Sequence, residues 1–160
     1  MNSANGLLVI VLTLVVALWL SIVPLPPWAQ WGRPEFVAMV VLYWMMAIPE
    51  RIGIGSAWLL GLVQDIVEGS VLGEHALALA VLAYLVLNLY QRMRMFTPLQ
   101  QAAVIFVFIG MHQLLCHWVQ ALAGASSSSL LLLMPALISA LLWPLLALLL
   151  RLLRRSYFVR

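Results

Sequence analysis

The sequence predicts an all-α membrane protein in which residues 1–160 form a single integral membrane domain with six transmembrane helices. Two observations lead to this fold class. Hydrophobic residues make up 66% of the chain and charged residues only 8%, compared with about 25% charged in an average soluble domain. The apolar residues also form six runs separated by proline, glycine or charged residues, as in a chain that crosses a bilayer repeatedly.

The first run, residues 6–23, ends in the proline-rich stretch 24–27, which is incompatible with a continuing helix. Trp28 and Trp31 follow, and tryptophan favours the headgroup level of a bilayer. This segment is therefore predicted to lie along one membrane surface. The run is long for the apolar part of a signal peptide and no basic residue precedes it, so it is interpreted as a retained span.

The second and third runs, residues 36–48 and 52–67, are short for membrane spans, and Pro49 and Arg51 mark the turn between them. The 13 residues of the second run would extend about 20 Å as a helix, whereas the hydrocarbon core is about 30 Å thick. Two short crossings and a re-entrant hairpin both remain open. Two crossings are preferred, because flanking charged side chains reach toward the membrane surface.

The last three runs, residues 76–90, 99–123 and 130–150, complete the six predicted spans. The serine run 126–129 is predicted to form a flexible external turn between the last two. With six spans, seven arginines share the face that carries both termini and only Arg33 lies opposite, so the positive-inside rule predicts cytoplasmic termini. The seven are Arg51, Arg92, Arg94, Arg151, Arg154, Arg155 and Arg160.

Small residues recur at every fourth position in and around the third run, which places them along one face of a helix. Such a stripe lets a second helix approach closely. Its one carboxylate is interpreted either as a local cap of the following turn or as a contact for a partner helix, with ion or proton carriage least favoured. The stripe consists of Gly53, Ala57, Gly61, Asp65, Gly69 and Gly73.

Other polar residues suggest structural roles more than ligand binding. Arg33 is predicted to pair with the acidic cluster near the outer surface, and Arg51 to fix its turn or bind a lipid phosphate. In the fifth run, His112, Cys116 and Gln120 recur every four residues and resemble half of a metal site, but no second cluster of Cys or His completes it. An interhelical hydrogen-bonding stripe is preferred, and His75 is predicted to be interfacial.

Several functional classes find no support. The chain lacks H-E-x-x-H, G-x-S-x-G and P-loop motifs, so no enzymatic activity, metal or cofactor is predicted. The arginines do not form a solvated basic face with interleaved aromatic residues, which argues against nucleic-acid binding. With one cysteine, no intramolecular disulfide is possible.

The stretches RPEFV, LYWMMAIPERIGIG and LLGLVQDIVEGSVLGEHALAL closely resemble the MreD family of bacterial rod-shape-determining membrane proteins. The resemblance implies an inner-membrane role in cell elongation with the single-pass protein MreC, the MreB filament, RodA and its partner transpeptidase. It also implies a six-helix fold similar to the S-components of energy-coupling-factor transporters. All residues of the stripe except Ala57 match motif positions of the family. The other motif positions are Arg33, Pro34, Tyr43, Trp44, Pro49, Arg51 and Tyr84.

The leading functional hypothesis is a scaffold that docks the transmembrane helix of MreC along the stripe from Gly53 to Gly73. The alternative is a small-molecule-binding, transporter-like subunit, because short spans interrupted by Gly or Pro often mark substrate sites. A flippase of a lipid-linked precursor is the third hypothesis and has the least support. It would need a cationic or hydrated cavity, whereas the arginines are predicted to lie at the cytoplasmic boundary.

Overall fold

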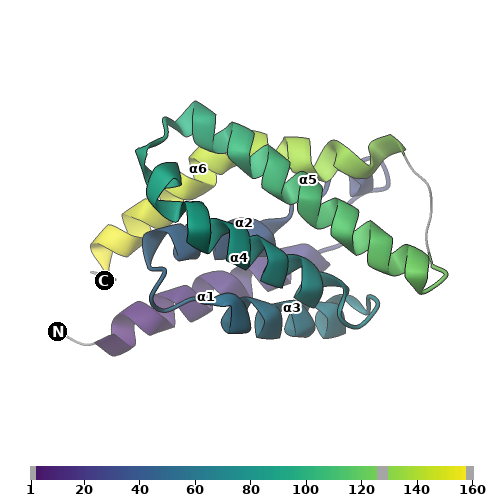
Figure 1. The fold of residues 1–160 in the computed structure, drawn as a ribbon, viewed down its shortest axis with the longest axis horizontal. Coiled ribbons are helices and arrows are strands. Elements are labelled where there is room, and N and C mark those ends of the chain that lie inside the picture. The colour runs from purple at the N-terminus through teal and green to yellow at the C-terminus, as the bar shows by residue number, and fades with distance from the viewer. Residues whose placement is uncertain (1–2, 126–129, 158–160) are drawn as a thin grey trace.

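The computed structural model describes residues 3–125 and 130–157, and within them it confirms the all-α class. Six α-helices and two short 3-10 helices form one bundle, and the described residues contain no strand (Figure 1). The serine run predicted as an external turn lies outside the described residues. The elements are α1 (Ser3–Ile22), η1 (Gln30–Gly32), α2 (Phe36–Ala47), α3 (Ile54–Glu68), α4 (Glu74–Met95), α5 (Pro98–Leu122), η2 (Leu130–Leu133) and α6 (Met134–Ser156).

Helix α2 is the centre of the bundle. Ten of its twelve residues are buried, and it contacts α1, α4, α5 and α6. A helix that is apolar all round is stable when other helices surround it, which accounts for the uninterrupted apolar sequence of α2. Trp44 is fully buried, and its indole Nε1–H donates to Thr13 Oγ1 of α1 at 2.9 Å.

Three segments are long and apolar enough to cross a membrane: α4, α5 and the stretch Leu131–Ser156. Helix α1 contributes a shorter apolar stretch, Gly6–Ile22. Helices α2 and α3, with 12 and 15 residues, extend only about 18 and 22 Å. A crossing by each of these two helices stays a prediction, and so does the count of six spans.

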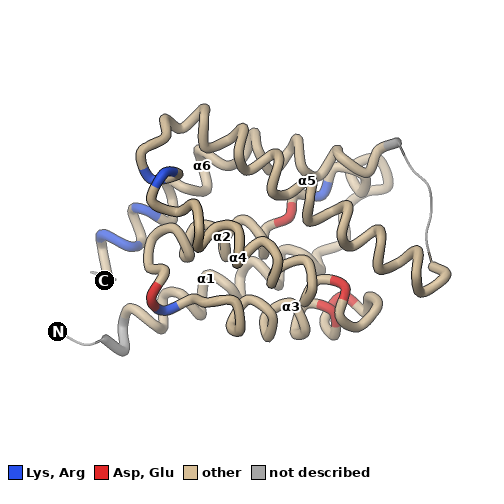
Figure 2. Tube along the Cα trace, in the orientation of Figure 1, with Lys and Arg blue, Asp and Glu red and all other residues tan. Residues whose placement is uncertain are grey.

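Charged residues divide between the two ends of the bundle (Figure 2). Most arginines lie where α1 begins and α6 ends, and we call this the basic end: Arg51, Arg92, Arg94, Arg151, Arg154 and Arg155. Asp65, Glu68 and Glu74 lie around the α3–α4 turn at the opposite end, which we call the acidic end. Arg160 lies outside the described residues.

Candidate functional site

Asp65 is the centre of a hydrogen-bonded turn at the acidic end. Its side chain is only 1% exposed, and both carboxylate oxygens accept hydrogen bonds from the residues that follow α3. Oδ1 accepts from the His75 backbone N–H at 2.9 Å, from His75 Nδ1 at 2.8 Å and from the Ser70 hydroxyl at 3.0 Å. Oδ2 accepts from the Gly73 N–H at 2.8 Å. The local interpretation of Asp65, as a cap for the following turn, is confirmed.

The turn itself depends on two glycines. Gly69 ends α3 with φ of +66°, and Gly73 precedes α4 with φ of +95°. Both values lie in the left-handed region, which side chains with a Cβ rarely adopt. These glycines let the chain reverse within the few residues between Glu68 and Glu74 and bring α4 back alongside α3.

The middle of the small-residue stripe packs α3 against α4. A Cβ atom added at Gly61 would lie 2.4 Å from the Ala76 Cα and 2.5 Å from its backbone nitrogen. Ala57 and Asp65 are buried along the same face. Gly53 precedes α3 in open space, with no atom within 4 Å of such a Cβ. A partner helix seated on Gly61 would therefore have to displace α4.

A polar layer continues from α4 to α5. Gln120 Nε2 donates to Glu74 Oε1 at 2.7 Å, and the Cys116 thiol lies 3.9 Å from the Glu74 carbonyl oxygen. His112 Nδ1 lies 3.9 Å from the Cys116 sulfur. The predicted interhelical hydrogen-bonding stripe is thus confirmed for Gln120 and Cys116. His75, predicted to be interfacial, is buried, because its ring is held by Asp65.

Donor atoms of Glu74, His75 and Cys116 lie within 4.8 Å of one another, and thiol, imidazole and carboxylate are the donor types of zinc sites. The structure thus places Glu74 and His75 of α4 beside Cys116, whereas His112, the histidine of the fifth run in the predicted half-site, does not belong to this group. All three residues already take part in the hydrogen bonds of the polar layer. The cluster is accounted for as part of that layer.

Glu35 extends the polar layer to the start of α2, beside a cavity of about 240 Å³. Its carboxylate accepts a hydrogen bond from the Gln113 side chain, and its backbone N–H donates to Ser139 Oγ at 2.9 Å. Burial raises the pKa of the Glu35 carboxyl to about 6. The sequence did not identify Gln113 and Ser139 as partners of Glu35. The only indication was that each is a polar residue within a long apolar helix.

Arg33 binds the end of α1. Its two terminal guanidinium nitrogens donate to the carbonyl oxygens of Ser21 and Val23. The predicted pairing of Arg33 with the acidic cluster is therefore wrong. The physical reason is that the last carbonyls of a helix lack partners within the helix, and a guanidinium from the next loop satisfies them.

The remaining motif residues separate into buried and exposed positions. Tyr43 and Trp44 are buried in α2, and Pro34 and Pro49 flank that helix in half-buried loops. Arg51 and Tyr84 are exposed, Tyr84 by 60%. Packing accounts for Tyr43 and Trp44, whereas the exposed Tyr84 side chain makes no hydrogen bond to a described residue.

Comparisons with known proteins agree with the resemblance in the motifs. A family model described as rod shape-determining protein MreD matches residues 1–153. The rod shape-determining protein MreD of Haemophilus influenzae is 36% identical over 154 residues, which cover 89% of this chain and 88% of that protein. No solved structure matches.

Proposed function

The chain belongs to the MreD family of rod shape-determining proteins, and from this premise we propose that it is a non-enzymatic membrane scaffold of the cell-elongation machinery. In this proposal it binds the transmembrane helix of MreC and so supports peptidoglycan synthesis, in a complex with MreB, RodA and the elongation transpeptidase. The observation that carries the proposal is the family match, which extends over nearly the whole chain.

We further propose an inner-membrane location with six crossings and both termini in the cytoplasm. Arginine is favoured on the cytoplasmic side of membrane proteins, and the basic end holds the start of α1 and the end of α6 (Figure 2). The short helices α2 and α3 fit this proposal if the bilayer thins locally or flanking polar residues reach its surface.

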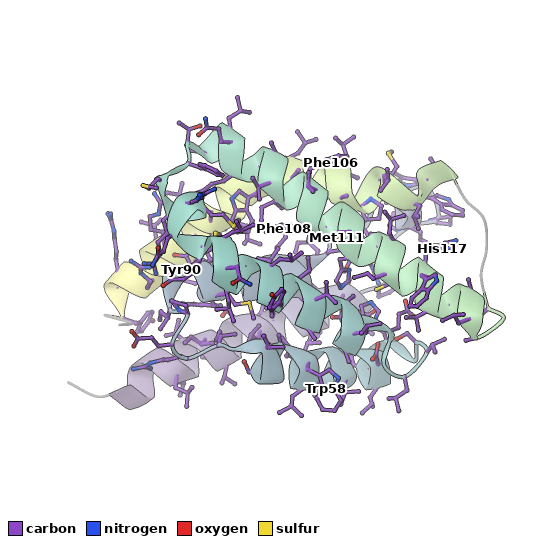
Figure 3. All side chains as sticks on the ribbon, viewed as in Figure 1. Trp58, Tyr90, Phe106, Phe108, Met111 and His117 are labelled. Carbon is purple, nitrogen blue, oxygen red and sulfur yellow. The ribbon has the colours of Figure 1, made fainter. Side chains whose placement is uncertain are left out.

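The outer face of α3 is the proposed docking surface for MreC. Helix α3 packs mainly against α4, through the small-residue stripe, and its opposite face exposes Trp58, Leu59 and Ile66. Trp58 points away from the other helices (Figure 3). Its indole N–H has no hydrogen-bond partner among the described residues. In a bilayer, helices associate through van der Waals packing and interhelical hydrogen bonds, and this face offers apolar contact surface and one indole donor.

Site-specific photo-crosslinking tests the proposal. A benzophenone side chain at Trp58 or Ile66 is expected to crosslink to co-expressed MreC, whereas the same group at Leu141 or Leu145 of α6 is not. The α6 positions are comparably exposed, at 72% and 58%, and serve as matched controls. Crosslinking from α6 alone would refute the α3 face. Failure of MreC to co-purify in mild detergent would refute the scaffold function itself.

The same preparation distinguishes the alternative. A transporter-like subunit would carry a stoichiometric water-soluble ligand, which native mass spectrometry of the purified protein detects. We expect a complex with MreC and no such ligand. A defined soluble ligand on protein that lacks MreC would favour the small-molecule-binding function instead.

A further inference from the structure

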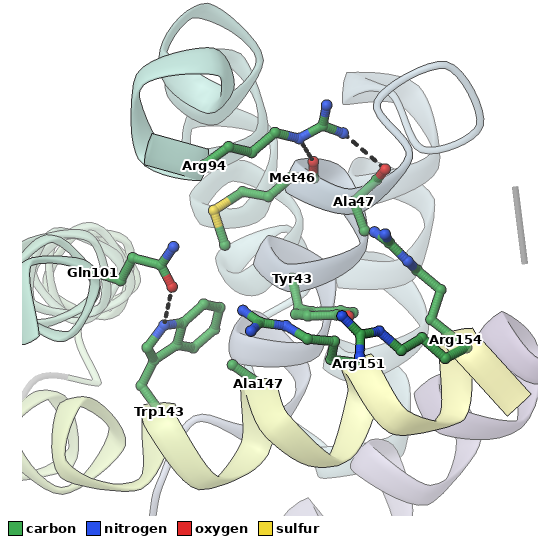
Figure 4. Close-up of a pocket in the computed structure, with 10 residues that line it drawn as sticks. Tyr43, Met46, Ala47, Arg94, Gln101, Trp143, Ala147, Arg151 and Arg154 are labelled. Carbon is green, nitrogen blue, oxygen red and sulfur yellow. Dashed lines mark hydrogen bonds between the residues drawn. The ribbon is translucent and has the colours of Figure 1, made fainter. Parts of the chain in front are cut away.

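A second cavity, of about 450 Å³, opens at the basic end between α2, α4, α5 and α6 (Figure 4). Four arginines line it: Arg94 from α4, and Arg151, Arg154 and Arg155 from the last turns of α6. Tyr43 and Trp143 contribute aromatic surface. No described aspartate or glutamate lines this cavity, and Glu50 borders a separate cavity together with Arg94 and Arg154.

The four arginines differ in what they already bind. Arg94 donates from Nε to the Met46 carbonyl oxygen at 2.5 Å and from a terminal nitrogen to that of Ala47 at 2.8 Å, so it caps the end of α2. The guanidinium groups of Arg151 and Arg155, like that of Arg154, form no hydrogen bond or ion pair with any described residue. Three neighbouring cations without a counterion repel one another, and an anion placed among them would relieve that repulsion.

The walls of the cavity are held in place. Trp143 is fully buried, and its indole Nε1–H donates to Gln101 Oε1 at 3.3 Å. Gln101 is fixed in turn by a bond from Nε2 to the Met93 carbonyl oxygen at 2.9 Å. The Tyr43 hydroxyl lies among the α6 guanidinium groups and has no hydrogen-bond partner in the described part of the chain (Figure 4). A neutral donor and several charged donors therefore converge on one space.

Arginine near the end of a membrane helix is common, and the helix dipole alone favours it there. The helix dipole does not explain why arginines from two helices, α4 and α6, line the same cavity beside Tyr43 and Trp143. Guanidinium groups match the paired oxygens of phosphate, and arginine is over-represented where proteins recognise that group. The chemistry of the cavity thus fits a phosphate oxyanion.

The position of the cavity indicates where the phosphate comes from. Along α6 the lining residues recur at about every fourth position, and the next face around the helix lines an apolar groove against α1 with Leu146, Leu149, Leu150 and Leu153. A charged site therefore lies directly beside an apolar face that acyl chains would cover. We propose that this cavity binds the phosphate headgroup of an anionic membrane phospholipid, whose acyl chains run along the leucine face of α6. This inference is independent of MreC binding.

The test uses the full chain in detergent without MreC, titrated with short-chain phosphatidylglycerol and followed by tryptophan fluorescence. We expect saturable binding, with an affinity about tenfold lower in the double variant Arg151→Gln/Arg155→Gln, because two charge-assisted hydrogen bonds are lost. Arg92→Gln is the matched control, since Arg92 is an exposed arginine at the same end that does not line the cavity. Its affinity should equal that of the wild type.

Two further arms separate the possible ligands. Phosphatidylcholine should bind at least tenfold more weakly than phosphatidylglycerol, and inorganic phosphate should not compete at millimolar concentration. Competition by inorganic phosphate at that concentration would overturn the lipid assignment. Equal phosphatidylglycerol affinity in the wild type and the double variant would overturn the site.

If the double variant does not fold, Tyr43→Phe replaces it. This substitution removes only the hydroxyl group and should weaken phosphatidylglycerol binding about threefold. An unchanged affinity in Tyr43→Phe, measured alongside Arg92→Gln, would likewise overturn the proposed site.

Discussion

The acidic and basic ends of the bundle differ in how their charged side chains are hydrogen-bonded. At the acidic end, Asp65 accepts four hydrogen bonds from the chain around it, and Glu74 is bound by Gln120. At the basic end, Arg94 is the one cavity arginine that bonds to another described residue. Charged side chains at the acidic end are therefore bonded within the fold, whereas most of those lining the basic cavity are not, as the proposed lipid site requires.

Burial explains why the two ends differ. An ionised side chain within a membrane protein is costly unless hydrogen bonds surround it, and Asp65 is almost completely buried. Arg151 and Arg155 are exposed, so water and lipid headgroups solvate them without help from the protein. Removing a charge should therefore destabilise one end and leave the stability of the other nearly unchanged.

The largest expected effect is at Asp65. Asp65→Ala leaves the backbone N–H groups of Gly73 and His75 without their acceptor, and should lower the free energy of unfolding by about 3–5 kcal/mol. Unfolding by SDS in mixed micelles, followed by tryptophan fluorescence, measures this change. Glu50→Gln is the control, because Glu50 is an exposed carboxylate at the basic end and its loss of charge should cost less than about 1 kcal/mol. Equal losses in both variants would contradict the central role of Asp65.

The second prediction tests the helix contact beside the same network. Gly61→Ala places a methyl group against the backbone of Ala76, and should destabilise the protein by about 1–3 kcal/mol as α3 is forced away from α4. Gly55→Ala, in the same helix but in open space, should instead stabilise it by about 0.5–1 kcal/mol. SDS unfolding of the two variants measures the sign of each change in the free energy of unfolding. Destabilisation by both variants would refute the close approach at Gly61.

Local sequence signals predicted the helices well, because proline, glycine and charged residues interrupt the apolar runs. The second run was predicted at residues 36–48 and α2 spans Phe36–Ala47. Thr97 and Pro98, which begin α5 with a capping box, are signals of the same local kind. In the middle of the small-residue stripe, at Gly61, the closely packed helix is α4 of the same chain, and docking of the MreC helix along the stripe stays a prediction.

Contacts between residues far apart in the chain could not be predicted from the sequence pattern. The bond from Gln113 to Glu35 joins residues 78 positions apart, and Arg94 reaches Met46 across 48 positions. No periodicity within one helix encodes such a pairing, because it depends on how the helices pack. The Arg33 prediction failed for the same reason, since opposite charge indicated the acidic cluster whereas unpaired carbonyls at the end of α1 were closer.

A smaller loss is expected at Arg94, the one cavity arginine with a structural role at the basic end. Arg94→Gln removes donors to the carbonyl oxygens of Met46 and Ala47, and should lower the free energy of unfolding by about 1 kcal/mol. The partly exposed site keeps the loss small because water replaces the donor. Arg92→Gln should change the stability by no more than about 0.5 kcal/mol in the same SDS titration. A larger loss in Arg92→Gln would mean that charge itself stabilises the basic end.

The smallest expected effect is at Arg155, and it tests the comparison most directly. In lipid-free detergent, Arg155→Gln should change the free energy of unfolding by less than about 0.5 kcal/mol, because no described residue bonds to its guanidinium group. Loss of the favourable interaction with the α6 dipole is offset by weaker repulsion from Arg151 and Arg154. With phosphatidylglycerol present, the wild type should gain more stability than the variant, since a ligand that binds only the folded state stabilises it. A loss at Arg155 as large as at Arg94 without lipid would show that both ends use charge for folding.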